Sequence, residues 1–213
     1  MDARKTKVTT LLLLLTVMTL GWTNRADAQA RMGVKGGLNV SNLYVDDVDD
    51  ENARFGFNVG VYGQVFSNDV FALQPELLFS TKGSKNEFNN SFFGIDQTVK
   101  FNLNYLDLPV LAVIKLGESA EIHVGPYASY LLSANLDYSG NINATDELDK
   151  DDFSAFDFGL AGGIGFNFGA MQVGARYNYG LVKVADSNNG ELLLGDARNS
   201  NAQLYLAFNF AQD

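Results

Sequence analysis

Only a few side chains in this sequence have the chemistry of a catalytic or metal-binding group. His123 is the single histidine and the chain has no cysteine, which excludes sites with several histidines and sites with thiolate ligands. His123 could still serve as the base of a serine-type hydrolase. We expect a structural role instead, because His123 follows the turn at Gly117 by a few residues and lies on the polar side of its segment. Its expected partners are Tyr127, Glu121 or water, and no catalytic residue is predicted.

Four charged residues lie on the polar side of segments in which polar and apolar residues alternate: Lys35, Glu76, Asp157 and Arg176. An enclosed charge needs a partner of opposite sign, since an unpaired buried charge is costly. We therefore expect these four residues to form a structural ion-pair network, with Glu76 and Arg176 at its centre. The alternative is that they line a narrow, gated pore.

Two stretches are dense in carboxylates, 46–51 (DDVDDE) and 146–152 (DELDKDD), and could offer oxygen ligands to a hard cation such as Ca²⁺. Their spacing does not match an EF-hand loop, and no glycine occupies the turn position of such a loop. We interpret them as solvated acidic surface, with divalent-ion bridging to lipopolysaccharide or partner binding as alternatives. No metal site and no cofactor are predicted.

The N-terminal residues 1–28 have the features of a secretory signal peptide. Basic residues precede an apolar run over 11–20, and small residues follow it. The run is shorter than the about 20 residues that a membrane-spanning helix needs. We therefore expect cleavage after Ala28 or Ala30, which leaves a single domain over 29–213.

The expected mature chain is acidic. Residues 1–28 carry four basic and two acidic side chains, so their removal changes the formal net charge from −10 to −12. Phosphate binding needs a concentrated basic surface, and the sequence contains none. Nucleic acid is therefore excluded as a partner.

Polar and apolar residues alternate in steps of two through most of the remaining chain, which is typical of β-strands with one apolar and one polar face. In the last segment, for example, Leu204, Leu206 and Phe208 alternate with Gln203 and Tyr205. No segment has a helical period or is apolar for long enough to form a transmembrane helix. Eight such segments are present: 31–40, 55–65, 71–82, 99–114, 121–132, 156–168, 171–179 and 202–210.

The fourth segment changes its alternation. Its apolar residues stand at odd positions up to Tyr105 and at even positions from Leu106 onward. A one-residue β-bulge near this point would give the whole strand one apolar face, and Pro109, which has no N–H to donate, makes irregular pairing there plausible. We predict a bulge near Tyr105–Leu106.

Short and long connections alternate along the chain. The short ones are 67–69, 117–119 and Gly169. The long, polar connections are 41–54, 83–96, 137–152 and 185–199. In an up-and-down arrangement, all tight turns therefore lie at one end of the strands and all long loops at the other.

The alternating segments could form a sheet with one face in water or a closed barrel. Every segment carries large apolar residues on one face, and exposing that face to water on eight strands would create a very large apolar patch. The other face carries charges such as Glu76 and Arg176, which need an enclosed polar environment or partners. Lipid outside and a polar lumen inside satisfy both faces. We predict an all-β fold: an eight-stranded antiparallel up-and-down transmembrane β-barrel of a bacterial outer membrane, with short periplasmic turns and long extracellular loops.

The end of the chain fits this barrel. The last strand must pair with the first to remove the open edge, so both termini are expected to be periplasmic. A final strand of alternating large apolar residues that ends near an aromatic, here Phe210, resembles the signal that outer-membrane assembly machinery recognises. The predicted partners are that machinery, outer-membrane lipid and lipopolysaccharide.

Several stretches together resemble the Bacteroidota outer-membrane β-barrel domain family, also called PorT-like: GVKGGLNVSNL (33–43), LQPELLFSTKG (73–83), NYLDLPVLAVIKLG (104–117), VGPYASYLL (124–132) and FGLAGGIGFNFG (158–169). The resemblance covers nearly all of the expected mature chain. It implies an eight-stranded barrel in the outer membrane and, for most members, no known activity. A few relatives take part in protein secretion.

We therefore expect a non-enzymatic, integral outer-membrane protein with a structural or surface-interaction role, a polar plugged lumen and acidic outer loops. An eight-stranded barrel has an interior just wide enough for side chains, which favours the plug. The alternatives are a narrow channel for ions or small solutes and an accessory component of a protein-secretion system.

Overall fold

The computed structural model describes residues 31–44, 53–90, 95–140, 144–147, 153–185 and 197–210. The predicted signal peptide and the acidic stretch 46–51 lie outside the described residues. Of the second acidic stretch, only the first two residues are described, as backbone.

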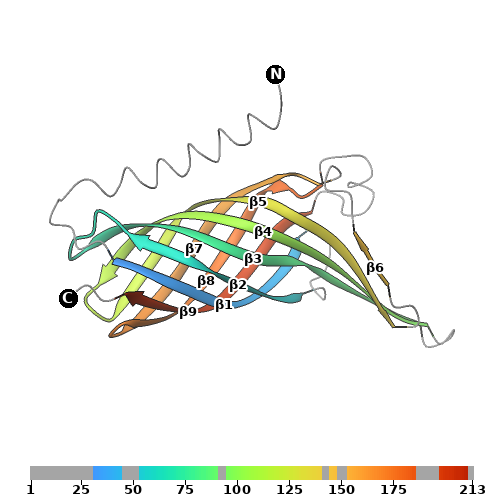
Figure 1. Ribbon diagram of the computed structural model, residues 1–213, viewed down its shortest axis with the longest axis horizontal. Helices are drawn as coiled ribbons and strands as arrows, with labels where there is room; N and C mark the ends of the chain where they lie inside the picture. The colour runs from blue at the N-terminus through green and yellow to red at the C-terminus, as the bar shows by residue number, and fades with distance from the viewer. Residues whose placement is uncertain are drawn as a thin grey trace, which may run out of the picture.

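Eight long antiparallel strands form a closed ring, as predicted (Figure 1). β4 pairs with both β3 and β5, and β1 pairs with both β2 and β9, so the sheet has no open edge between its first and last strands. A short ninth strand, β6 (Ala144–Glu147), pairs with β5 outside the ring. The ring strands are β1 (Arg31–Tyr44), β2 (Arg54–Gln64), β3 (Phe71–Asn90), β4 (Ile95–Leu116), β5 (Ala120–Gly140), β7 (Phe156–Phe168), β8 (Met171–Lys183) and β9 (Arg198–Phe210).

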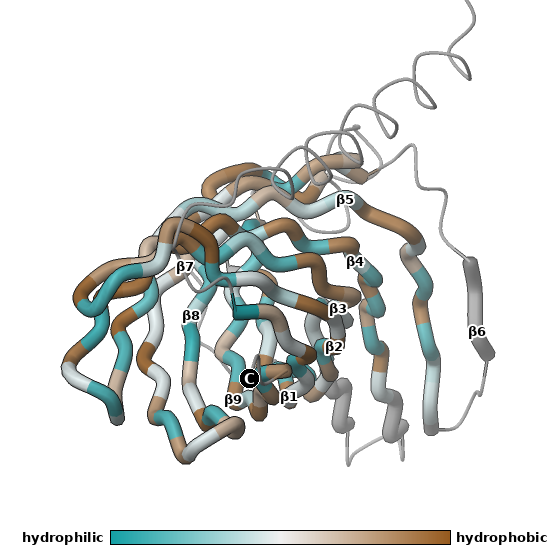
Figure 2. The backbone as a smooth tube through the Cα atoms, turned by 60° about the vertical axis from the view of Figure 1, so that its left-hand side comes forward, coloured by the Kyte–Doolittle hydropathy of each residue, from teal (hydrophilic) through white to brown (hydrophobic). Residues whose placement is uncertain are grey.

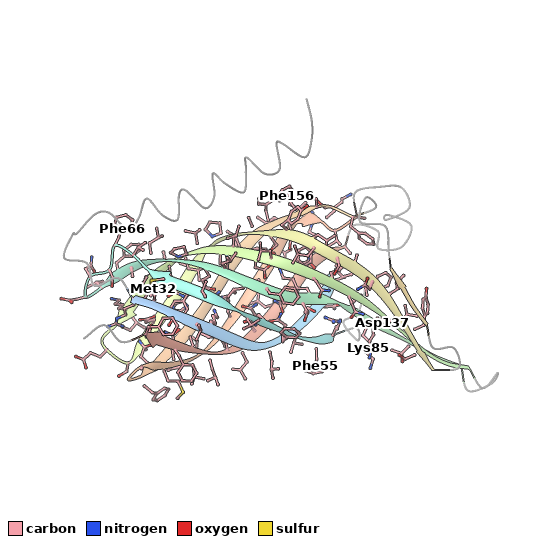
Figure 3. All side chains as sticks on the ribbon, in the orientation of Figure 1. Met32, Phe55, Phe66, Lys85, Asp137 and Phe156 are labelled. Carbon is pink, nitrogen blue, oxygen red and sulfur yellow. The ribbon has the colours of Figure 1, made fainter. Side chains whose placement is uncertain are left out.

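The two faces of each strand meet different surroundings, as the alternation predicts. In β9, Leu204 and Leu206 are 60% and 47% exposed, whereas the alternating residues Gln203 and Tyr205 are 3% and 2% exposed. Apolar and polar residues alternate along the strands in Figure 2. Large apolar side chains such as Phe156 point away from the barrel in Figure 3. Most of the polar strand residues therefore line the lumen, and most of the large apolar residues form the outer surface.

The outer apolar belt has the height of a bilayer core. On β4 the outward residues are apolar from Leu106 to Leu116, and the next outward residue, Asn104, bonds Ser133 on β5 at 2.8 Å. The 106–116 stretch is about 34 Å long at about 3.4 Å per residue. At a strand tilt of about 40° this corresponds to about 26 Å across the membrane, close to the apolar band of outer-membrane barrels. Among the described residues, no helix is long and apolar enough to cross a membrane.

The three tight turns lie at one end of the barrel, where β1 also begins and β9 ends. Between β2 and β3, Asn68 Oδ1 accepts hydrogen bonds from the backbone N–H groups of Val70 and Phe71 at 2.9 and 2.8 Å. The other two turns each contain a glycine with positive φ, Gly117 at 71° and Gly169 at 64°. Such a conformation strains residues with a Cβ, which explains glycine at both turns.

A register shift lies between Asn104 and Tyr105 in the pairing of β4 with β5, next to the predicted bulge near Tyr105–Leu106, but the extra residue lies on β5, so the strand predicted to carry it was wrong. Tyr105 pairs with Leu131 while the residue before it pairs with Ser133, so Leu132 of β5 is the extra residue. β4 keeps its odd-numbered residues inward on both sides of this point. The apparent change of face near Tyr105–Leu106 arises because the lumen itself becomes apolar at that depth.

β3, β4 and β5 continue beyond the other strands at the end opposite the tight turns (Figure 1). β3 and β4 remain paired as far as Asn90 and Ile95, and β4 remains paired with β5 as far as Gly140. The predicted long connections therefore include strand residues: 83–90 and 95–96 in the connection 83–96, and 137–140 and 144–147 in the connection 137–152. Alternation did not indicate these strands because, beyond the apolar belt, neither face has to be apolar.

Candidate functional site

Glu76 of β3 lies at the centre of the barrel and pairs with two cations. Its two carboxylate oxygens accept hydrogen bonds of 2.7 Å from Nη1 and Nη2 of Arg176 on β8. Nζ of Lys35 on β1 lies 3.4 Å from the same carboxylate. Gln74 is the third residue that donates to this carboxylate, through Nε2 at 2.7 Å. All four side chains are buried, so the structure brings together three of the four residues expected in the ion-pair network.

The ring of Tyr205 on β9 supports the two cations of this cluster. Lys35 Nζ lies 3.6 Å from the ring centroid and Arg176 Cζ lies 5.6 Å from it. The ring covers Gly174 on the paired strand β8, so that a Cβ at position 174 would overlap Cζ and Oη of the tyrosine. Only a glycine at that position allows the ring to lie flat against the wall and face the cations.

A second cluster surrounds Glu121 near the tight turns. Its carboxylate accepts hydrogen bonds from Gln172 at 3.0 Å, Asn167 at 3.2 Å and Gln64 at 3.3 Å. His123 Nε2 lies 3.2 Å from the carboxylate. Donors from four strands thus converge on one buried acid.

A third cluster surrounds Lys82, farther from the tight turns than Glu76. Lys82 Nζ donates to Asp107 Oδ1 at 2.9 Å and to Ser129 Oγ at 3.2 Å, and it lies 4.0 Å from Asp157 Oδ2. Asp157 therefore belongs to this cluster and does not join Glu76 and Arg176 as expected. β7 carries Asp157 close to the end away from the tight turns, whereas Glu76 and Arg176 lie about midway along the lumen.

Two tyrosines and an asparagine complete the cluster around Lys82. The rings of Tyr105 and Tyr127 lie 4.8 and 5.1 Å from Lys82 Nζ. Asp157 Oδ2 accepts hydrogen bonds from Asn199 at 2.9 Å and from Tyr127 at 3.2 Å. Lys82 ends the segment 71–82, in which it shares the polar side with Glu76, but nothing in the alternation pairs it with Asp107, because alternation defines the face of a residue and not its neighbour on the adjacent strand.

An apolar cluster follows at the loop end of the lumen. Its members lie on β4, on β5, and beside the ends of β7 and β8, and each is at most 4% exposed. They are Leu103, Tyr105, Leu131, Ala134, Phe153 and Val184. The lumen thus changes from charged to apolar along its axis.

His123 has the environment of a structural histidine. Its Nε2 faces Glu121, one of its expected partners, and its Nδ1 lies 3.4 Å from the hydroxyl of Tyr205. Tyr127, another expected partner, bonds Asp157 instead. Both ring nitrogens are engaged by lumen side chains, and neither points to the surface where a lipid or peptide could be attacked. Within the described ranges, no group of three acidic or histidine side chains is placed to hold a metal ion.

Comparison with protein families identifies one match: the family model described as outer membrane protein beta-barrel domain matches residues 23–186. A search of curated proteins finds no match. The match ends before β9, the strand that closes the ring.

Among solved structures, Ail of Yersinia pestis in complex with a heparin analogue is 15% identical, covering 85% of this chain and 99% of its own with a TM-score of 0.48. A major outer membrane protein of Thermus thermophilus is 12% identical over 85% of this chain and 100% of its own, with a TM-score of 0.49. Neisserial surface protein A is 14% identical over 85% and 97%, with a TM-score of 0.47.

Proposed function

Because this chain belongs to the outer membrane protein beta-barrel domain family and is an integral protein of the outer membrane, we propose that it acts there as a structural or surface-interaction protein with a closed lumen. The finer resemblance to PorT-like barrels of Bacteroidota is part of the same proposal. This resemblance supports a barrel without enzymatic activity, because most members of that family have no known activity.

The observation that carries the closed lumen is the contact between Arg176 and Glu76. β3 and β8 are four places apart in a ring of eight strands, so they stand on opposite walls. Two hydrogen bonds of 2.7 Å between them cross the lumen, and Lys35 approaches from a third strand. Solutes would have to separate a buried, hydrogen-bonded ion pair to pass, which is costly.

Single-channel recording in a planar lipid bilayer tests this proposal against the channel alternative. We expect no steady conductance from purified protein whose insertion is confirmed by heat-modifiable migration on a detergent gel. As a control for sensitivity, the double variant Glu76→Ala/Arg176→Ala removes the crossing pair and is expected to give measurable current if it folds. Steady conductance of the unchanged protein would establish a channel and overturn the proposal.

Lack of enzymatic activity is supported by the surroundings of His123. The base of a hydrolase must reach both a nucleophile and an orienting acid. His123 has an acid, Glu121, on one nitrogen, but its other nitrogen faces the buried hydroxyl of Tyr205. Incubation with labelled phospholipid and lipopolysaccharide is expected to release no fatty acid.

Lipopolysaccharide is the proposed lipid partner at the outer rim. Lys85 on β3 lies directly opposite Lys100 on β4, which in turn lies opposite Asp137 on β5. Figure 3 shows Lys85 and Asp137 on the part of the strands that continues past the apolar belt. Lysine ammonium groups bind phosphate oxygens through charge-assisted hydrogen bonds, so these two lysines offer cations to the phosphates of lipopolysaccharide. We expect lipopolysaccharide to raise the unfolding temperature in vesicles, and Lys100→Gln to reduce that increase.

A further inference from the structure

Seven buried polar atoms on the wall formed by β7, β8 and β9 have no hydrogen-bond partner within the part of the protein that the structure describes. Their side chains are at most 5% exposed. The atoms are Oδ1 of Asp157, Nε of Arg176, Oδ1 of Asn178, Nδ2 and Oδ1 of Asn201, and Nε2 and Oε1 of Gln203.

The residues that carry these atoms are neighbours. Arg176 pairs directly with Gln203, and Asn178 pairs directly with Asn201, so four inward side chains form a block of two by two on β8 and β9. Asp157 Oδ1 extends toward the same wall from β7, since it lies 3.2 Å from the place that a Cβ would take on Gly180 of β8. The partnerless atoms therefore form one patch.

The mixture of donors and acceptors selects the ligand. An anion would require donors, and a cation would require acceptors, but the patch presents three donor nitrogens among four acceptor oxygens. Exchanging O and N of either amide leaves this mixture unchanged, because both atoms of Asn201 and Gln203 lack partners. Water both donates and accepts, and buried water typically makes about three hydrogen bonds to otherwise unsatisfied groups.

We propose that this patch binds a cluster of about two to four long-lived water molecules inside the barrel. Without them, each partnerless group would lose its hydrogen bonds to water on burial and gain none in return, which is unfavourable. The cluster joins two charged groups of side chains, because Arg176 also bonds Glu76 and Asp157 also faces Lys82. The interior is thus one hydrogen-bonded network in which water supplies the connection between the two ion-pair clusters.

Water-to-amide nuclear Overhauser effects test the proposal in ²H,¹⁵N-labelled full-length mature protein in detergent micelles. We expect cross-peaks between water and the side-chain amide protons of Asn201 and Gln203. The sign of the nuclear Overhauser effect is expected to be that given by water molecules that stay bound for longer than about a nanosecond. The rotating-frame experiment separates these from chemical exchange. Asn39 is the matched control, because its Nδ2 donates to Phe57 O, Ser80 Oγ and Thr81 O. Absence of cross-peaks at Asn201 and Gln203 would overturn the proposal, and so would the sign of freely exchanging bulk water.

A variant then tests whether the waters form one cluster. Asn201→Leu removes two of the seven atoms from the middle of the patch and is expected to reduce the water cross-peaks of Gln203 at least twofold. If this variant does not fold, Asn201→Ala offers the same loss of polar atoms with less volume. Unchanged cross-peaks at Gln203 in a folded variant would contradict a shared cluster. Channel recordings separate this proposal from the proposed function: a non-conducting barrel without these cross-peaks would contradict the water cluster alone, whereas steady conductance would contradict the closed lumen.

Discussion

Arg176 and Glu76 join opposite walls of the barrel through two parallel hydrogen bonds of 2.7 Å, although 100 residues separate them in the chain. No backbone pairing connects β3 to β8, so this bond braces the ring across its diameter. Lys35 Nζ lies 3.4 Å from the same carboxylate, which makes Glu76 the acid that both basic side chains contact.

Removing the charge of Glu76 is therefore expected to destabilise the barrel strongly. Glu76→Gln keeps the shape of the side chain but leaves Arg176 and Lys35 buried without a counter-charge, which costs about 3–5 kcal/mol. The urea-induced unfolding free energy in lipid vesicles measures this effect. Glu118→Gln, in the exposed turn after β4, is the matched control and is expected to change stability by less than about 0.5 kcal/mol. Equal stability of the two variants would contradict the role given to Glu76.

A methyl group on Gly174 is expected to displace the ring of Tyr205. Gly174→Ala would overlap the ring and move it from beneath Lys35, at a cost of about 1–3 kcal/mol. Gly162→Ala is the control, since a Cβ at Gly162 meets nothing within 4 Å. Thermal unfolding of both variants provides the comparison. In a Tyr205→Ala background, Gly174→Ala is expected to lower the unfolding temperature by less than it does in the unchanged protein. Equal losses in the two backgrounds would argue against the contact between the methyl group and the ring.

The direction of the two faces can be measured with lipids that carry bromine in their acyl chains. Trp22 is the only tryptophan, so a chain that begins at Gln29 has no tryptophan. The tryptophan fluorescence of such a chain then comes only from an introduced residue. The outward substitution Leu206→Trp is expected to lose most of its fluorescence in brominated lipid, because Leu206 is 47% exposed on the outer surface. The inward substitution Tyr62→Trp should be quenched several-fold less. The reverse order would mean that the apolar face does not contact lipid.

The terminal aromatic of β9 gives a prediction about assembly. Phe210 pairs with Met32 at the tight-turn end of the seam between the last and first strands. Phe210→Ser is expected to slow folding in vesicles that contain the outer-membrane assembly machinery, with much less effect on unassisted refolding in detergent. Phe66→Ser provides the control, because Phe66 is 75% exposed at a turn and lies outside β9. Equal slowing of both variants would remove the case for recognition of this strand.

The sequence predicted the ring of strands, the tight turns and the face of most strand residues because these depend on local alternation. Glu76 and Arg176 could be paired before the structure because strands three and seven of eight must stand opposite each other. Asp157 was placed in the wrong cluster because its depth depends on the stagger between β7 and β8. That stagger is fixed by cross-strand pairs such as Gly163 with Arg176, which alternation does not encode.

The remaining errors have related causes. The sequence did not pair Lys82 with Asp107, since their contact bridges two neighbouring strands whose register only the ladder defines. The bulge was assigned to β4 because apolar residues were assumed to face lipid at every depth. Leu103 and Tyr105 instead belong to an apolar cluster inside the lumen.

Leu132, the extra residue of β5, changes which positions of that strand face the lumen: odd-numbered residues up to Leu131 lie inward, and Ala134 and Leu136 lie inward beyond it. An in-frame deletion of Leu132 would join Leu131 directly to Ser133, and regular alternation would still turn Ala134 and Leu136 inward. The apolar lining of the barrel mouth and the lipid-facing belt therefore both tolerate the loss of this one residue, and the chain can change length there without turning any other side chain to the opposite face.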